Sequence, residues 1–411
     1  MGLIKETILL LSFFTAGCYF FNKRLLIPLY IILLPTDGIF LQEYNLAGVV
    51  NINVIINFIT LLSLAPELFK KYKVTTLQKY ANHIVVILLL YLIFWNIKDA
   101  YFDLIAYEKA TNRIIYYLVE YLPLFLIIRL LNKPDINELL KSSIYFSLIF
   151  LTICAILSPY LASFGFKIGA EDGMEFSTIN RFDGIFGKGD ENSFGVFCSM
   201  ILGFLFANNE KKKINFYEIS VLIFSITGVL LSGSRAAVIS LLIIVFYFLR
   251  RSSDFGITLK IIFVLLVFGV IFAPWIELVL SRFNTLYTQL DFNTSSNRIG
   301  KWSIYLNHML SNPSIFLYGN EATFSLTSYS GVRAAHNFYI QMLYNLGAIP
   351  VTLLITYLFR LYFVIPKNSL YLNPVYYTLP VIMETMTVSA FATLPFFCLI
   401  IASNSSYLEK S

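Results

Sequence analysis

The chain is poor in charge. Charged side chains make up only 13% of its 411 residues, whereas 58% are hydrophobic and the mean hydropathy is +0.73. A soluble globular domain contains about 25% charged residues, so this composition excludes a soluble globular protein. The 39 Phe and 27 Tyr also exclude a disordered chain. The net charge of +6 is spread thinly without a basic arm, so nucleic acid is not an expected partner. The composition predicts a polytopic membrane protein.

Cysteine and histidine are also scarce. The four cysteines lie in separate apolar runs, as Cys18, Cys154, Cys198 and Cys398. None has a near neighbour at metal-ligand spacing, which excludes a disulfide framework and a zinc site. The three histidines, at positions 83, 308 and 336, are too scattered for a His-rich metal site. We therefore expect no bound metal and no cofactor.

Long apolar runs make up most of the remaining sequence. A spanning helix needs about 20 mostly apolar residues, and about twelve runs approach that length. They lie near 7–22, 25–41, 47–66, 81–97, 114–131, 142–160, 192–207, 216–232, 235–249, 258–280, 336–364 and 375–402. They lack the period-2 alternation of membrane barrel strands, and lipid otherwise admits only helices. We predict an all-α bundle of about twelve transmembrane helices, a single membrane domain over residues 1–411.

Lysine and arginine in the loops indicate the orientation. Four short loops are rich in these residues and are expected to face the cytoplasm: 67–80, 129–141, 208–215 and 250–260. The alternate loops are mixed or acidic and are expected to face outward. Two of them are long. The 161–191 loop holds six acidic and three basic residues, and the 281–335 loop has about 55 residues.

The 281–335 loop is expected to contain an amphipathic helix. Ser296 and Asn297 are suitable N-cap residues, and the helical pattern ends at Asn312-Pro313. One stripe is apolar and consists of Ile299, Trp302, Leu306, Met309 and Leu310. The other side carries Arg298, Lys301 and His308. This pattern predicts a folded helix that lies near the membrane surface and turns His308 to solvent.

Four polar constellations lie at predicted outward ends of spans. They are 181–187 with Asn192, 231–237, Asn297-Arg298 with Trp302, and 333–339 with Gly347. Polar residues at such depths need partners or have a function. These four segments are therefore the candidates for the functional site.

Arg235 follows the turn Ser232-Gly233-Ser234 and begins the next apolar run. A guanidinium beside the N–H groups of a helix N-terminus can bind phosphate. An interfacial arginine can equally snorkel to the membrane surface without a ligand. Arg181 has a similar alternative, because its loop is acidic and a surface ion pair would satisfy it.

His336 lies where the long outer loop re-enters the membrane, three residues after Arg333. A neutral imidazole at this position could take a proton from a hydroxyl group. The alternative is a hydrogen-bonded interfacial histidine without a catalytic role. The sequence position alone leaves both interpretations open.

Taken together, the ordered motifs resemble the O-antigen ligase and polymerase superfamily of bacterial inner-membrane proteins. The resemblance covers roughly residues 175–365. It rests on Arg181-x-x-Gly184 before a span, Ser232-Gly233-Ser234-Arg235, Arg298 with Trp302, and His336-Asn337 followed by Gly347. The family often has Gly-x-Gly near the end of the long-loop helix, where this chain has Tyr318-Gly319-Asn320.

The resemblance implies a metal-independent glycosyltransferase that uses glycans carried on undecaprenyl pyrophosphate at the periplasmic face of the inner membrane. It implies catalytic roles for three residues: Arg181 and Arg235, which would stabilise the departing pyrophosphate, and His336, which would be the base. It implies substrate-binding roles for Arg298, Arg333, Asn337, Asn192 and Trp302.

The resemblance leaves three activities to separate. We expect an O-antigen polymerase, which joins repeat units on the carrier lipid. The alternatives are an O-antigen ligase, which transfers the glycan to lipid A-core, and, from another class, a flippase or exporter of lipid-linked oligosaccharide. The expected partners are undecaprenyl-pyrophosphate-linked oligosaccharides, the lipid bilayer and a separate chain-length regulator.

Overall fold

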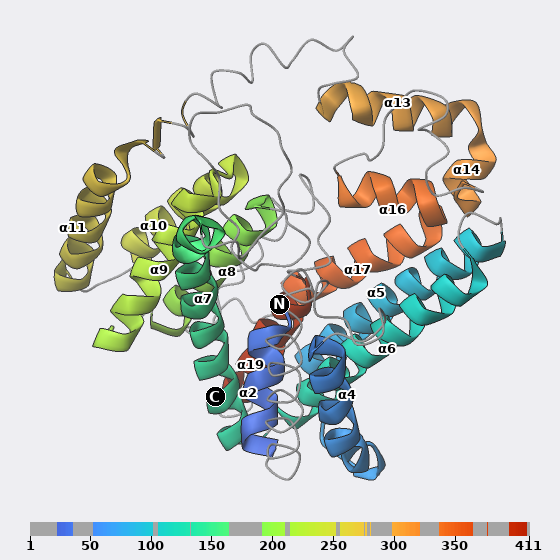
Figure 1. Cartoon of the computed structure of the whole chain (residues 1–411), viewed down its shortest axis with the longest axis horizontal. Helices are drawn as coiled ribbons and strands as arrows, with labels where there is room; N and C mark the ends of the chain where they lie inside the picture. Colours follow the sequence, from blue (N-terminus) through green and yellow to red (C-terminus); the bar gives the residue numbers. More distant parts are fainter. Residues whose placement is uncertain are drawn as a thin grey trace.

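A computed structural model describes most of the chain (Figure 1). The described residues are 23–35, 52–101, 106–131, 133–163, 191–209, 214–251, 255–274, 276–277, 280, 298–320, 337–364, 376 and 394–408. Within these ranges every regular element is a helix, and no strand occurs. The predicted all-α fold class is therefore confirmed for this part of the chain.

The first half of the chain forms α2 (Lys23–Leu33), α4 (Ile52–Leu64), the 3-10 helix η1 (Ala65–Phe69), α5 (Thr76–Tyr101), α6 (Tyr107–Leu130) and α7 (Pro134–Ser163). The second half forms α8 (Glu191–Asn209), α9 (Phe216–Ser232), α10 (Arg235–Arg251), α11 (Phe255–Ile271), α13 (Arg298–Ser311), α14 (Pro313–Tyr318), α16 (Phe338–Leu346), α17 (Ala348–Val364) and α19 (Leu394–Leu408). Apart from η1, α13 and α14, these helices overlap the apolar runs, and the 336–364 run is divided at Gly347.

Two helices are long and apolar enough to cross a bilayer, at Thr76–Tyr101 and Pro134–Leu157. Shorter apolar helices lie at Val54–Phe69, Phe216–Ser232, Thr258–Ile271, Ala348–Arg360 and Leu394–Ser403. These are consistent with a helical membrane protein. The count of about twelve spans stays a prediction.

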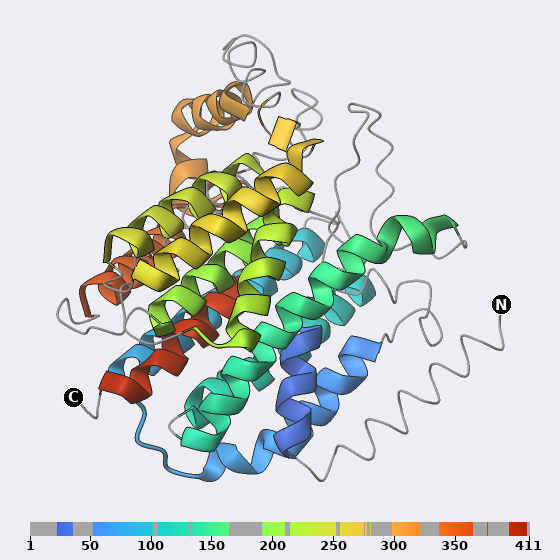
Figure 2. The ribbon, with the colours of Figure 1, turned by 90° about the vertical axis from the view of Figure 1, so that its left-hand side faces the viewer.

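The centre of the bundle is α8. Its apolar residues from Phe194 to Ala207 are buried, and the helix packs against α9 and α10. Close packing requires a glycine on α9, since a Cβ at Gly228 would overlap Cys198 Sγ on α8 and lie 3.2 Å from Thr152 Oγ1 on α7. Figure 2 shows α9, α10 and α11 side by side.

The outer face of α11 carries exposed large apolar residues, among them Phe263, Leu266 and Val270. A soluble monomer rarely leaves such a contiguous apolar surface in contact with water. A lipid environment accounts for it, because hydrocarbon solvates these side chains without the cost that water imposes.

The helices α13 and α14 lie at one end of the bundle, beyond α16 (Figure 1). They pack against α16, and α14 also contacts α17. A helix is therefore present at Arg298–Ser311, and it ends before Asn312-Pro313 as the sequence indicated, while the outward-facing loop over 281–335 stays a prediction.

Candidate functional site

The Ser-Gly-Ser-Arg segment forms a tight turn between α9 and α10. Gly233 ends α9 in the left-handed conformation (φ 58°), and its N–H donates to the Leu230 carbonyl at 3.0 Å. Ser234 then caps α10, because its Oγ accepts from the Ala237 N–H at 3.4 Å. Glycine is the residue that adopts positive φ without strain, and serine is a preferred N-cap. The local sequence thus places Arg235 at the first position of α10, as predicted.

The N-terminal part of α8 packs against the turn between α9 and α10. A Cβ at Gly195 would overlap Ser232 Oγ and lie 2.9 Å from the Ala237 Cβ. Ser232 is itself fully buried; its Oγ donates to the Val229 carbonyl at 2.7 Å and accepts from the Ser234 N–H at 3.2 Å. Only a residue without a side chain fits at position 195. The turn is therefore in direct contact with α8 and is stabilised by two hydrogen bonds of Ser232.

Asn192 lies three residues before Gly195, in the first turn of α8, and is half-buried. Residues three apart share one face of a helix, so Asn192 lies on the side of α8 that meets the Arg235 turn. Arg235 is also half-buried. The positive end of the α10 dipole and the guanidinium coincide here, which favours an anion. The structure thus joins two of the predicted constellations.

The other two constellations are joined by the packing of α13 on α16. Tyr305 and Met309 of α13 and Tyr344 of α16 form a small buried cluster. The Tyr305 and Tyr344 rings meet edge to face, with centroids 4.8 Å apart. Trp302 is half-buried on the same helix, and Arg298 is its first residue.

The buried face of α13 differs from the predicted stripe. Met309 is buried as expected, but Leu306 is 41% and Leu310 is 75% exposed, and Tyr305 takes the buried position. The apolar pattern could not show this, because an aromatic partner on α16 selects which side of the helix is covered. The prediction that His308 faces solvent is also wrong. His308 is half-buried, and its Nδ1 lies 3.3 Å from the Tyr344 hydroxyl.

Burial also changes the acidity of this cluster. Loss of water around the Tyr305 hydroxyl raises its pKa to about 12, and the neighbouring Tyr344 acts in the same direction. A hydrogen bond with Gln341 of α16 opposes the shift. The phenol is therefore neutral at physiological pH and is available as a hydrogen-bonding group between the two helices.

Two glycines fix the far end of this assembly. Gly319, after α14, has φ 78°, and Gly347, between α16 and α17, has φ 85°. A Cβ at Gly319 would overlap the Asn345 carbonyl oxygen, and a Cβ at Gly347 would overlap that of Leu317. The Asn320 N–H also donates to the Tyr344 carbonyl at 2.7 Å. The departure from Gly-x-Gly at 318–320 therefore retains the glycine on which the backbone contact depends.

Asn337 is the N-cap of α16. Its Oδ1 accepts from the Ile340 N–H at 3.1 Å, and it is buried. This structural role was not part of the sequence prediction, although an asparagine directly before an apolar helical run is the usual signal for it. A substrate-binding role for Asn337 stays a prediction.

Three predicted site residues, Arg181, Arg333 and His336, lie outside the described residues. Their roles stay predictions. Among the described ones, Asn192 lies on the part of α8 that meets the turn before Arg235, and Trp302 lies on the helix that packs against the one capped by Asn337. In Figure 1 the first pair of elements, α8 and α10, and the second pair, α13 and α16, lie on different sides of the view.

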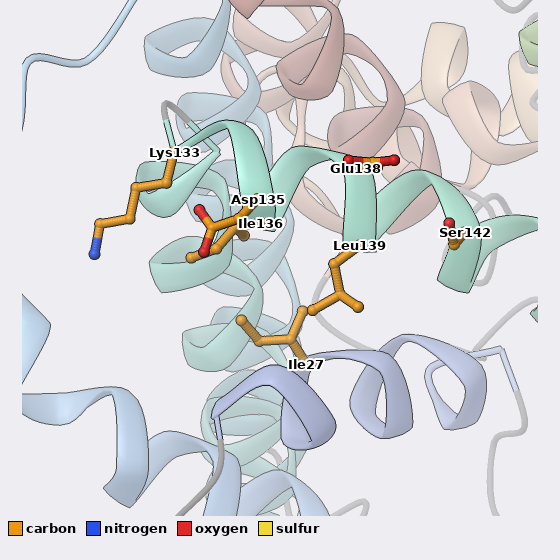
Figure 3. A pocket seen from close by; sticks show the side chains of 7 residues that line it. All are labelled: Ile27, Lys133, Asp135, Ile136, Glu138, Leu139 and Ser142. Atoms are coloured by element: carbon orange, nitrogen blue, oxygen red, sulfur yellow. The ribbon is translucent and has the colours of Figure 1, made fainter.

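A cavity of about 530 Å³ lies elsewhere, between α2 and the first turns of α7 (Figure 3). It is lined by Ile27, Lys133, Asp135, Ile136, Glu138, Leu139 and Ser142. Except for Ile27 on α2, these residues lie in or next to the 129–141 segment, which is expected to face the cytoplasm. No predicted site residue lines this cavity, so we do not assign it to the candidate site.

The fold and the site together indicate an all-helical membrane protein with an anion-favouring helix terminus. Residues 220–355 match a family model described as O-Antigen ligase, which supports the O-antigen ligase/polymerase superfamily. The match includes the Arg235 turn and α13, α14 and α16, and it excludes Arg181 and Asn192. No curated protein and no solved structure matches the chain.

Proposed function

We propose that this protein is an O-antigen polymerase. It joins undecaprenyl-pyrophosphate-linked oligosaccharide repeat units at the periplasmic face of the bacterial inner membrane. One observation carries the proposal: the segment that matches the O-antigen ligase family contains both the Arg235 turn and the packed α13–α16 assembly. Both lie among the residues that the structure describes.

The first chemical requirement is stabilisation of the leaving group. Transfer breaks the bond between the anomeric carbon of the donor glycan and an oxygen of undecaprenyl pyrophosphate, and negative charge develops on that oxygen. Arg235 at the N-terminus of α10 meets this charge with a guanidinium and with the positive end of the helix dipole. Because Ser232 is buried against Gly195 and hydrogen-bonded within the turn, the turn has little room to move when the charge appears. Arg181 has the same role from its loop.

The second requirement is a base for the acceptor hydroxyl. His336 takes the hydroxyl proton while the acceptor oxygen forms the new glycosidic bond, and the pyrophosphate leaves. His336 directly precedes Asn337, which caps α16. Arg298, Arg333 and Trp302 bind the glycans, and the arginines supply the positive charge.

We favour polymerase over ligase because each polymerase is fitted to its own repeat unit, and such enzymes vary outside their shared motifs. The family match over residues 220–355 fits both activities equally. A flippase or exporter is not favoured, since the matched family consists of transferases.

The experiment is a lipopolysaccharide ladder from cells that lack the gene. We expect core with a single repeat in the null strain, and a full ladder after complementation with the wild type. Arg235→Ala and His336→Ala are expected to leave core with a single repeat at normal protein levels. Core alone, with long chains accumulated on the carrier lipid, would identify a ligase instead.

The matched control is Arg251→Ala, at the opposite end of α10. Arg251 is exposed and contacts the Tyr247 hydroxyl at 3.1 Å. The Arg251→Ala substitution removes one positive charge from α10, as Arg235→Ala does, but leaves the Arg235 turn unchanged. A full ladder is therefore expected. Full ladders from both site variants would overturn the assignment of Arg235 and His336. Reconstitution with labelled lipid-linked repeat separates the classes, because a flippase moves its substrate without lengthening it.

A further inference from the structure

Two buried acceptor oxygens lie one turn apart near the C-terminal end of α5. Asn96 is 3% exposed and Asp99 is 4% exposed. Among the described residues, Oδ1 of each side chain has no hydrogen-bond partner. Residues three apart lie on the same face of a helix. A buried acceptor without a donor costs free energy, so a pair of them on one face calls for a ligand or ordered water.

The hydrogen-bond donors near these two Oδ1 atoms bond to other acceptors. Asn96 Nδ2 donates to the Leu92 carbonyl at 2.8 Å, within its own helix. The Trp95 side chain forms a hydrogen bond with the Asp99 carboxylate, which leaves Oδ1 as the second oxygen. Lys98 Nζ donates to the Asn345 carbonyl at 2.9 Å. Two cations, Lys98 and Arg113, also lie near Asp99, but neither donates to its Oδ1 among the described residues.

This end of α5 is tied to the helix that follows His336. Besides the Lys98 contact, the Asn345 amide donates to the Tyr91 hydroxyl at 3.3 Å, and Asn345 is buried. Asn345 lies eight residues after Asn337 on α16, a distance of about 12 Å along the helix axis. The two acceptors thus lie on a helix that is hydrogen-bonded to the C-terminal end of α16, about two helical turns after its Asn337 cap.

Aromatic rings accompany the acceptors. Tyr91 and Trp95 meet edge to face with centroids 5.6 Å apart, and Trp95 is half-buried. A few fixed polar groups among aromatic side chains are typical of a small-molecule subsite. Acceptors without donors of their own select a ligand rich in hydroxyl groups, because each hydroxyl donates one hydrogen bond.

We propose that Asn96 and Asp99 form a remote glycan subsite, in which their Oδ1 atoms accept hydrogen bonds from sugar hydroxyls of the repeat unit. The inference rests on the proposed function and adds a specificity-determining element to it. The subsite binds a sugar away from the reacting bond. It lies outside the segment that matches the family, where a strain-specific element is expected.

The test uses the full-length protein in lipid nanodiscs with the host strain's own lipid-linked repeat. Asn96→Leu removes the acceptor and keeps a similar volume. Loss of one hydrogen bond made equally in ground and transition states raises KM by about tenfold and leaves kcat unchanged. We expect the same for Asp99→Leu. Asp99→Asn retains an acceptor oxygen and is expected to be closer to the wild type.

The matched control is Asn82→Leu. Asn82 lies on the same helix, is 6% exposed, and also has an Oδ1 atom without a partner among the described residues. It lies 14 residues before Asn96, near the opposite end of α5. Its KM is expected to equal that of the wild type. Equal KM values for Asn96→Leu, Asp99→Leu and the active wild type would overturn the subsite and leave ordered water as the partner.

A direct binding measurement separates this inference from the proposed function. The probe is the repeat-unit oligosaccharide released from its carrier by mild acid, and the signal is tryptophan fluorescence compared with Trp95→Phe. Binding that is lost in Asn96→Leu supports the subsite even if the wild type lengthens no chain, in which case only the polymerase proposal fails. Without chain lengthening and without binding, both are overturned.

Discussion

Gly319 and Gly347 allow the backbone after α14 to pack directly against the backbone between α16 and α17. Each has positive φ, and each lies against a carbonyl oxygen of the other segment, Asn345 for Gly319 and Leu317 for Gly347. The two glycines are far apart in sequence, but both lie in one contact between segments 317–319 and 345–347, which we call the joint. Through it, the position of α16 depends on the segment that follows α14.

Gly347→Ala is expected to open this joint. The new Cβ overlaps the Leu317 carbonyl oxygen, and alanine at φ 85° adds backbone strain of about 1–3 kcal/mol. We expect a lower melting temperature of the purified protein and loss of chain lengthening. Gly269→Ala on α11 is the control, since a Cβ there meets no atom within 4 Å. An unchanged melting temperature for Gly347→Ala would contradict the joint.

Gly195→Ala tests whether α8 supports the Arg235 turn. Its Cβ overlaps Ser232 Oγ, so the turn must move and the activity is expected to fall at least tenfold. The double variant with Ser232→Ala removes the nearest atom and is expected to recover part of the activity, because contacting residues are energetically coupled. Chain lengthening in a reconstituted assay measures both. Strictly additive losses would argue against the contact.

Ser234 separates capping from charge at the same position. Ser234→Ala loses the cap and is expected to lower the free energy of unfolding by about 1 kcal/mol. Ser234→Asn and Ser234→Asp both retain a capping oxygen, but aspartate adds a negative charge beside Arg235. We expect Ser234→Asp to have at least a tenfold lower turnover than Ser234→Asn. Equal turnover for the two variants would mean that no anion binds at this helix terminus.

Asn337 can be tested for its two roles in the same way. Asn337→Ala is expected to destabilise the protein by about 1 kcal/mol through loss of the cap. Asn337→Asp keeps the capping oxygen and loses the amide donor. If the amide binds substrate, Asn337→Asp restores the melting temperature and leaves KM raised. If KM also returns to the wild-type value, capping is the whole role of this residue.

The sequence by itself determined the helices and the short turns. Long apolar runs leave the backbone no alternative to helix in lipid, and the structure has helices at those positions in its described part. The Arg235 turn was also predictable, since Gly233 and Ser234 act within a few residues of their own backbone. These features depend on local chemistry, which a sequence states directly.

Tertiary structure alone decided which side chains meet. Tyr305 rather than Leu306 is buried because Tyr344, 39 residues later, supplies its partner. The sequence did not indicate the Asn96 and Asp99 pair, because a polar residue at the end of an apolar run is common and its partners are not visible in the sequence. Burial and pairing depend on neighbours brought together by folding, and no local pattern specifies those neighbours.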